Sequence, residues 1–176
     1  VALQLLEKLP GVLGRMAACD ASGVRKTLVQ AILATDMSVH GDLLALINAR
    51  LANQEGFEPD SADDRRLLVA FLLHCADLCN PLKPHAVSRR VAADLGREFA
   101  AQAALEQAAG LPVSVMLSPT EVTRATNEVG FITAVVSPLY KTLAELAPPL
   151  SVCLQLIEAN RRTWEAVIAN AQRSEE

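Results

Sequence analysis

The chain has 176 residues, of which 51% are apolar and 20% are charged, and its formal net charge is −4. An acidic chain without a dense run of Lys and Arg does not suggest nucleic acid as a partner. Aromatic residues make up only 3%. The core must therefore rest on Leu, Val, Ile and Ala, which suits packed helices better than a β-sandwich.

The first third of the sequence predicts short helices followed by two longer ones. Apolar spacing predicts a helix over residues 1–9, ended by Pro10, and a short helix over 12–18. The next segment, 20–23, predicts a turn that starts a helix reaching Met37. Gly41 is expected to break or kink this helix before helical spacing resumes over 43–51. Because the chain opens without Met inside an apolar helical pattern, we expect a fragment of a longer domain.

The middle of the sequence contains the most apolar helix. A polar loop over 53–60 leads to Ser61, which with Asp64 resembles a capping motif. The helix is predicted from 62 to about 78, and Pro81 prevents its continuation. Its purest apolar run, 67–73, is too short to cross a bilayer, so no membrane span is expected.

The last part predicts three further helices. Pro84 opens a long helix that ends at Gly110, and a loop follows over 111–117. Ser118 is predicted to cap a helix that runs toward residue 146 and is kinked at Pro138. Two prolines then precede an amphipathic helix over about 150–172. No strand pattern is visible, so the fold class is all-α, in one compact unit.

The four cysteines are interpreted as reduced thiols, because a chain of this length and apolar content needs no disulfides. This usage predicts a cytoplasmic protein, and no signal peptide is visible. The four are Cys19, Cys75, Cys79 and Cys153.

The most informative stretch runs from His74 to Pro84. It places Asp77 near the end of the apolar helix, where the helix dipole disfavours a negative charge. A bound cation would explain a carboxylate there. The alternative is that Asp77 caps the following loop or pairs with Lys83, and the residues alone leave both interpretations open.

Several segments resemble, in the same order, motifs of class I 3′,5′-cyclic nucleotide phosphodiesterases. The clearest is His74-Cys-Ala-Asp-Leu-Cys-Asn-Pro-Leu-Lys-Pro84, and a second is Ala34-Thr-Asp-Met-Ser-Val-His40. Further matches are Glu98-Phe99, Gly110-Leu-Pro112, Ser114 with Met116, Gly130-Phe-Ile132, Pro138-Leu139, Asn160 and Trp164. The resemblance covers essentially the whole chain, and it implies the C-terminal part of an HD-type, multi-helix catalytic domain.

The resemblance implies hydrolysis of cAMP, cGMP or both to 5′-nucleoside monophosphates in signalling. The attacking water would be activated by two divalent metals, zinc with magnesium or manganese. Asp77 matches a metal ligand, and Asp36, His40, His74 and Glu98 match residues that support the site. The expected substrate pocket comprises Met37, Leu78, Asn80, Leu95, Met116, Glu128 and Phe131. A buried His40, a turn-forming Asn80 and plain core packing of Met37, Leu78, Leu95 and Met116 remain alternatives.

One departure from the family pattern concerns the base. Glu128 stands where the family has a purine-binding Gln, whose amide both donates and accepts hydrogen bonds. An ionised Glu only accepts, which suits guanine and repels the ring-nitrogen acceptor of adenine. We therefore expect weakened cAMP binding, with a guanine bias or no purine selectivity, unless Asn127 takes the amide role. Val91, Val115 and the pair Ala103-Ala104 depart from the pattern around the pocket wall.

A second departure concerns the metals. In the family, the other metal ligands and the general-acid His lie in an upstream His-Asp region, whereas none of the three histidines here lies in a His-Asp dipeptide. We expect neither full metal binding nor turnover by this chain alone, and we expect the upstream half of the same domain as its partner. Two alternatives are a catalytically dead helical interaction domain and a small zinc module of His74, Cys75, Asp77 and Cys79.

Overall fold

A computed structural model describes residues 4–5, 8, 10–14, 16–53, 56–113 and 120–175. All regular secondary structure in these ranges is helical, which confirms the predicted all-α class. The chain divides into two compact units, Val1–Asp77 and Leu78–Glu176, rather than the single unit expected from the sequence. Each unit is described by itself.

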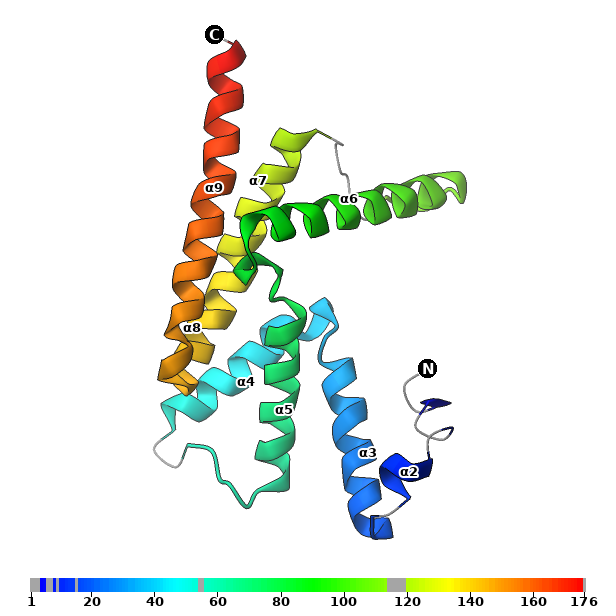
Figure 1. Cartoon of the computed structure of the whole chain (residues 1–176). Helices are drawn as coiled ribbons and strands as arrows, with labels where there is room; N and C mark the ends of the chain where they lie inside the picture. Colours follow the sequence, from blue (N-terminus) through cyan, green and yellow to red (C-terminus); the bar gives the residue numbers. More distant parts are fainter. Residues whose placement is uncertain are drawn as a thin grey trace. The chain divides into compact units, whose positions relative to one another are not determined.

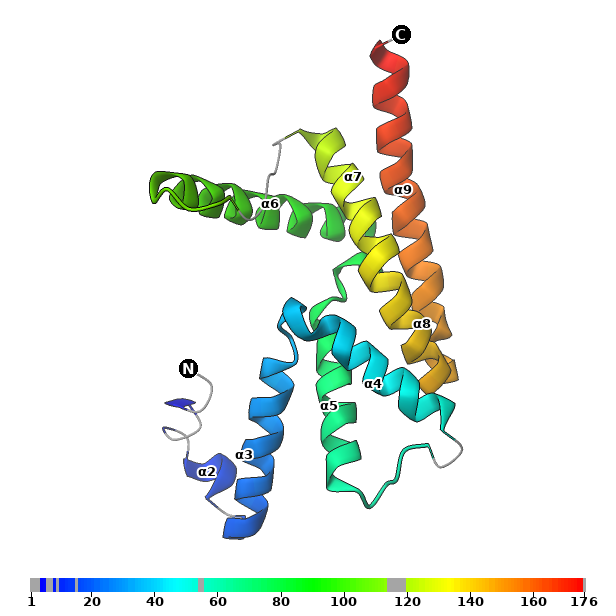
Figure 2. The same ribbon diagram turned by 180° about the vertical axis from the view of Figure 1, so that it is seen from behind.

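Unit 1 is built around a pair of packed helices, α3 and α5 (Figures 1 and 2). Helix α4 also packs on α5. The core residues of this unit include Ala31, Leu43, Ile47, Ala70 and Phe71. In order, the elements are α2 (Pro10–Leu13), α3 (Ala18–Leu33), the 3₁₀ turn η1 (Met37–Val39), α4 (His40–Ala52) and α5 (Ala62–Asp77).

The predicted capping motif at the start of α5 forms, with one change of partner. The backbone N–H of Asp64 donates to Ser61 Oγ at 3.2 Å. The carboxylate of Asp64 is buried and accepts instead from the N–H of Glu58 at 2.9 Å, and Arg50 pairs with it at 3.1 Å. The cap therefore ties the polar loop and the end of α4 to the first turn of α5.

Unit 2 is built around the helical run α7–η3–α8, which packs lengthwise on α9, as both ribbon views show (Figures 1 and 2). Its buried apolar residues include Ala125, Ile132, Val136, Leu139, Leu143, Ile157 and Trp164. The elements are η2 (Asn80–Leu82), α6 (His85–Ala108), α7 (Glu121–Phe131), η3 (Ile132–Val136), α8 (Ser137–Leu146), η4 (Pro148–Ser151) and α9 (Val152–Glu175).

The predicted interruption at Pro138 takes the form of a π-helical segment, η3. Proline has no N–H to donate, and its ring clashes with the carbonyl one turn earlier. The helix widens before it, so that the N–H of Ser137 donates to the carbonyl of Ile132, five residues back. A π-turn is a known way to absorb such a defect without ending the helix.

Gly110 ends α6 as predicted. It has a positive φ of 68°, a conformation that glycine adopts without steric cost. Its N–H donates to Gln107 O at 3.1 Å and that of Leu111 to Glu106 O at 2.9 Å, which is the Schellman pairing.

Several predicted boundaries are wrong. Pro10 begins α2 instead of ending a helix, since proline is favoured at the first helical position. Helix α3 already begins at Ala18, so the expected turn over 20–23 is helical, and no helix spans 12–18. The break before α4 lies over 34–39, ahead of Gly41.

Thr120, not Ser118, caps α7 by accepting from the N–H of Thr123. Ser118 and most of the predicted helix 1–9 lie outside the described residues.

One helical stretch, Glu121–Leu146 with 26 residues, is long and apolar enough to cross a bilayer by length and composition alone. This is weak evidence, because a core helix of a soluble protein passes the same test. Ala125, Ile132 and Val136 of this stretch are fully buried within unit 2. The absence of a membrane span therefore stays a prediction.

Asn160 joins three elements of unit 2 through its buried side chain. Its Nδ2 donates to the carbonyls of Pro81 at 2.6 Å and Lys83 at 2.8 Å. Its oxygen, which can only accept, receives the Nδ1–H of His85 at 3.1 Å. The imidazole of His85 in turn meets the ring of Trp164 edge-on, with centroids 4.8 Å apart.

Replacing Asn160 by Ala should lower the free energy of unfolding by about 2–3 kcal/mol, because it leaves the buried carbonyl of Pro81, the carbonyl of Lys83 and the His85 imidazole N–H without this partner. Urea denaturation measures the change. Gln155→Ala, at an exposed position on the same helix, is the matched control and should stay within about 0.5 kcal/mol. Equal effects of the two substitutions would contradict the role given to the Asn160 amide.

Candidate functional site

Asp36 lies between α3 and α4, within the matched motif that runs from Ala34 to His40. Its Oδ1 accepts the backbone N–H of Ser38 at 2.8 Å, so it caps η1. Hydrogen bonds from Ser38 hold the pKa of Asp36 below its ordinary value. The carboxylate is exposed and ionised, and the neighbouring Met37 is 44% exposed, so core packing does not explain Met37.

His40 and His74 form a hydrogen-bonded pair that links the two matched motifs. His40 Nδ1 and His74 Nε2 are 2.9 Å apart, with ring centroids 5.2 Å apart and planes inclined by 44°. His74 is fully buried, and its Nδ1 has no hydrogen-bond partner. One ring donates and the other accepts, so a single proton lies between them when both rings are neutral.

Burial favours that neutral state. It lowers the pKa of His40, and it is also the main cause that lowers the pKa of His74. The charge that His40 can carry lowers the pKa of His74 further, whereas the carboxylate of Asp77 raises it. The two imidazoles are therefore neutral at pH 7, and Asp77 lies close enough to act on His74.

Asp77 is the last residue of α5 and is exposed, as a metal ligand would need to be. Asp77 lacks the neighbouring ligands that a metal ion would need. No group of three or more His, Cys, Asp or Glu side chains that could hold a metal ion occurs in the described part of the chain. The small zinc module considered above is therefore not formed, and Asp77 by itself does not make a metal site.

Asn80 begins η2 in unit 2 and is held by Ser88. Its Nδ2 lies 3.3 Å from both the carbonyl and the hydroxyl of Ser88, which is fully buried. The Asn80 side-chain oxygen is buried and has no hydrogen-bond partner. The bonds to Ser88 favour the turn-forming interpretation of Asn80, and the oxygen remains available to a further donor. Sequence reasoning missed Ser88, for which no local signal exists.

Glu128 and Phe131 lie three residues apart on α7 and are both half-buried. Burial raises the pKa of the Glu128 carboxyl, and the charge of Arg124 one turn earlier opposes this shift. Asn127, the alternative amide, is exposed. Glu128 is thus the more enclosed of the two polar side chains, and it shares a face of α7 with the aromatic ring.

The remaining expected site residues are scattered. In unit 2, Leu78 is half-buried, whereas Leu95 is 42% exposed and Glu98 is exposed. Met116 lies outside the described residues. Within unit 1 the structure brings His40, His74 and Asp77 together, and within unit 2 it brings Glu128 and Phe131 together.

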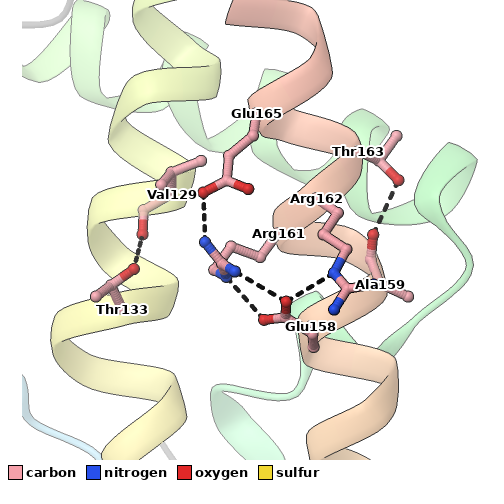
Figure 3. Close-up of polar contacts among 8 residues, drawn as sticks. All are labelled: Val129, Thr133, Glu158, Ala159, Arg161, Arg162, Thr163 and Glu165. Atoms are coloured by element: carbon pink, nitrogen blue, oxygen red, sulfur yellow. Dashed lines mark hydrogen bonds and ion pairs between the residues drawn. The ribbon is translucent and has the colours of Figure 1, made fainter.

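A further charged cluster on α9 was not anticipated. Arg161 binds Glu158 through two contacts of 2.8 Å and also pairs with Glu165, while Arg162 binds Glu158 at 2.8 Å (Figure 3). The two arginines lower the pKa of Glu158 to about 2. The partners are three or four residues apart along one helix, so the cluster supports α9 and forms no site.

Comparison with known proteins identifies the family. A family model described as 3′5′-cyclic nucleotide phosphodiesterase matches residues 1–157. The chain therefore belongs to this family, as the sequence motifs predicted.

Individual relatives agree with this assignment. The chain is 34% identical over 151 residues to isoform F of a Drosophila melanogaster 3′,5′-cyclic-AMP phosphodiesterase. It is 29% identical over 143 residues to the Homo sapiens high affinity cGMP-specific 3′,5′-cyclic phosphodiesterase 9A. These matches cover 82% and 81% of this chain but only 23% and 24% of the two relatives.

The fold is also that of solved phosphodiesterase domains. The phosphodiesterase domain of the Salpingoeca rosetta rhodopsin phosphodiesterase superposes with a TM-score of 0.84 at 32% identity. The superposition covers 91% of this chain and 49% of that one. The chain thus spans about half of a solved phosphodiesterase domain.

The His40–His74 pair should make stability depend on pH. An unfolded imidazole takes up its proton near pH 6.5, whereas the folded rings, with lowered pKa values, resist protonation. The contribution is therefore fully present above pH 6.5 and is lost as the pH falls below it toward the folded pKa values. Urea midpoints at pH 7.5 and 5.5 should show a smaller loss for His40→Asn than for the wild type.

NMR titration of the imidazole ring protons gives an independent measurement, and His40→Asn assigns the signals. Both rings should titrate below the ordinary histidine value. Titration of either ring at or above that value would show that burial does not control the pair.

Proposed function

We propose that the chain forms the C-terminal part of a cyclic nucleotide phosphodiesterase catalytic domain, spanning residues 1–176. The observation that carries the proposal is the hydrogen bond between His40 and His74. It joins the two segments that match the family motifs and lies one turn from Asp77, at the exposed end of α5. The names of the relatives support cAMP or cGMP as the substrate of the intact protein.

In the proposed reaction, water attacks the phosphorus of the cyclic phosphodiester and the bond to the 3′ oxygen breaks, which gives a 5′-monophosphate. Two divalent metals, zinc with magnesium or manganese, would activate the water, as in other two-metal phosphoester hydrolases. Asp77 is the residue proposed to bind one of them, with Asp36, His40, His74 and Glu98 in support. Because the described residues provide no complete ligand set, we propose that these 176 residues alone do not turn over substrate.

The nucleotide is proposed to bind against the side chains identified from the family motifs. Phe131 would stack on the purine and Glu128 would meet its edge, since both are half-buried on one face of α7. Asn80 would approach the sugar or base with its unpaired oxygen. Met37, Leu78, Leu95 and Met116 complete the proposed pocket. The cytoplasm is the proposed location, supported by cysteines that form no disulfide.

The lack of a complete ligand set also favours a second candidate. A helical domain derived from a phosphodiesterase, without catalytic activity, would likewise show one exposed carboxylate and an altered purine-reading position. Activity of the complete polypeptide encoded by the gene distinguishes the two functions.

Asp77→Asn in the complete polypeptide should lower kcat/KM for cyclic nucleotides by about 100-fold or more, because it removes a metal-binding charge from the reacting centre. Bound metal, measured by mass spectrometry, should fall with it. Asp60→Asn, at an exposed loop position of the same unit, should leave both unchanged. Full activity of Asp77→Asn, or turnover by the 176-residue chain free of contaminating enzyme, would contradict the proposal.

Glu128→Gln should improve hydrolysis of cAMP relative to cGMP, because the amide supplies the donor that an ionised carboxylate lacks. The wild-type ratio of kcat/KM for cAMP over cGMP should rise as the pH falls through the raised pKa of Glu128, since the protonated acid both donates and accepts. The ratio should be flat with pH in Glu128→Gln.

Taking the ratio cancels any pH dependence that the two substrates share. Asn127→Ala tests the alternative amide and should leave the ratio unchanged. Equal cAMP and cGMP hydrolysis by both the wild type and Glu128→Gln would remove Glu128 from the purine-reading role.

A further inference from the structure

Three side chains of different chemistry lie in one row along α7. Arg124, Glu128 and Phe131 follow one another at intervals of four and three residues, which places them on one face of the helix. All three are half-buried. Glu128 and Phe131 are the residues proposed to meet the edge and the ring of the purine. Arg124 extends their row by one turn and adds a cation to it.

The guanidinium of Arg124 is not engaged by the acidic side chain one turn before it. That side chain, Glu121, pairs instead with Arg89 of α6 at 2.6 Å. Within the described ranges, neither Arg124 nor Glu128 takes part in an ion pair, although Arg124 is near enough for its charge to act on Glu128. Both charged groups are therefore available to a ligand that approaches this face.

The elements packed against α7 bring few other charges to Glu128. The segment η3 carries none, and Arg89 of α6 is held by Glu121. The charged side chains of α9 drawn beside α7 in Figure 3 pair among themselves: Glu158, Arg161, Arg162 and Glu165. The charge that acts on the pKa of Glu128 is that of Arg124, which opposes the rise caused by burial and so favours the ionised carboxylate.

Guanine and adenine present opposite hydrogen-bonding patterns to such a pair of groups. Guanine has N–H donors at N1 and at its 2-amino group, next to the O6 acceptor, whereas adenine has an acceptor at N1 next to its 6-amino donor. An ionised carboxylate only accepts hydrogen bonds, and a guanidinium only donates them. Glu128 followed by Arg124 therefore matches both parts of the guanine edge and mismatches both parts of the adenine edge.

We propose that Arg124 is a specificity-determining residue, whose guanidinium donates to O6 of guanine while Glu128 accepts from N1–H and the 2-amino group, so that the intact domain selects cGMP over cAMP. This inference rests on the proposed function, because it takes Glu128 and Phe131 as the base-binding side chains. It adds a second group that reads the purine, and it commits to guanine where Glu128 alone leaves a lack of selectivity open.

The first test replaces Arg124 in the complete polypeptide that the gene encodes. Arg124→Met keeps a long side chain but removes the charge and the donors. It should lower the ratio of kcat/KM for cGMP over cAMP by about tenfold or more, which is the discrimination that a good arginine–guanine contact provides. Arg124→Lys keeps a charged donor, so its ratio should lie between those of the wild type and Arg124→Met.

The matched control is Arg173→Met, which removes an exposed arginine from α9 and should leave the ratio unchanged. Measuring both nucleotides with one preparation cancels the amount of folded enzyme, so that partial misfolding of a variant does not alter the ratio. An unchanged ratio in Arg124→Met, or a wild type that prefers cAMP, would overturn the inference.

Cyclic inosine monophosphate separates the two proposed contacts, because its base keeps N1–H and O6 but lacks the 2-amino group. Arg124→Met should reduce kcat/KM for cGMP and for the inosine nucleotide by the same factor. Glu128→Gln should reduce it more for cGMP, since only guanine offers the carboxylate a second donor. The wild type should prefer the inosine nucleotide to cAMP, a comparison that requires no variant, and the opposite preference would contradict the contact with O6.

The pH dependence gives a readout that a purely structural role of Arg124 would not change. In the wild type, the ratio of kcat/KM for cGMP over cAMP should fall as the pH falls through the pKa of Glu128, because the protonated acid also donates. Removing the cation takes away the influence that lowers this pKa, so in Arg124→Met the fall should begin at a higher pH. The same pH profile in both proteins would contradict the placement of Arg124 beside Glu128.

These results are separable from the proposed function. If Asp77→Asn abolishes turnover while Arg124→Met affects both nucleotides equally, the function stands and the role of Arg124 is wrong. If the complete polypeptide turns over neither nucleotide, equilibrium dialysis with cGMP and cAMP decides. Binding of cGMP that Arg124→Met weakens by about tenfold relative to cAMP would support the inference without the catalytic function. Absence of cGMP binding would overturn it.

Discussion

The hydrogen bond between His40 and His74 fixes the geometry on which the candidate site depends. It joins the first residue of α4 to the last turn of α5 across 34 positions of sequence. The loop between α3 and α4 is also held at Asp36, which caps η1. Two side-chain anchors therefore position the segment between α3 and α4, in addition to its backbone hydrogen bonds. Because His74 is fully buried, the bond forms in an environment where an unpaired imidazole would be costly.

The fold could be predicted well where the determining chemistry is local. Ser61 with Asp64, Gly110 and Pro138 each mark a helix start, end or defect through their own backbone or side chain. All three mark it in the structure, although the Asp64 carboxylate binds Glu58 instead of closing the cap on Ser61. Helix α3 shows the opposite case. It begins at Ala18 without a side-chain cap, so no residue type in the sequence marks its start. The polar residues that suggested a turn over 20–23 lie inside the helix.

The candidate site could be predicted only as a set of residues. Motif spacing identified Asp36, His40 and His74, but the pairing of the two imidazoles depends on the packing of α4 against α5, which spacing does not encode. The same holds for Ser88, whose contact with Asn80 arises from the way η2 meets α6. Burial is also non-local. Met37 and Leu95 are apolar, yet both are exposed, because the elements around them leave these positions uncovered.

Asp77 and Glu128 show how environment gives one chemical group two properties. Glu128 is half-buried, and the loss of water raises its pKa, which favours the neutral acid. Asp77 is exposed at a helix C-terminus, where water solvates the charge but the helix dipole opposes it. A bound cation would offset the unfavourable interaction between the Asp77 charge and the helix dipole. A hydrogen-bonding ligand would instead use Glu128, which can donate a hydrogen bond when its carboxyl group is protonated. The two carboxyl groups thus lie in different environments, which supports proposing different ligands for them, a metal for Asp77 and the edge of a base for Glu128.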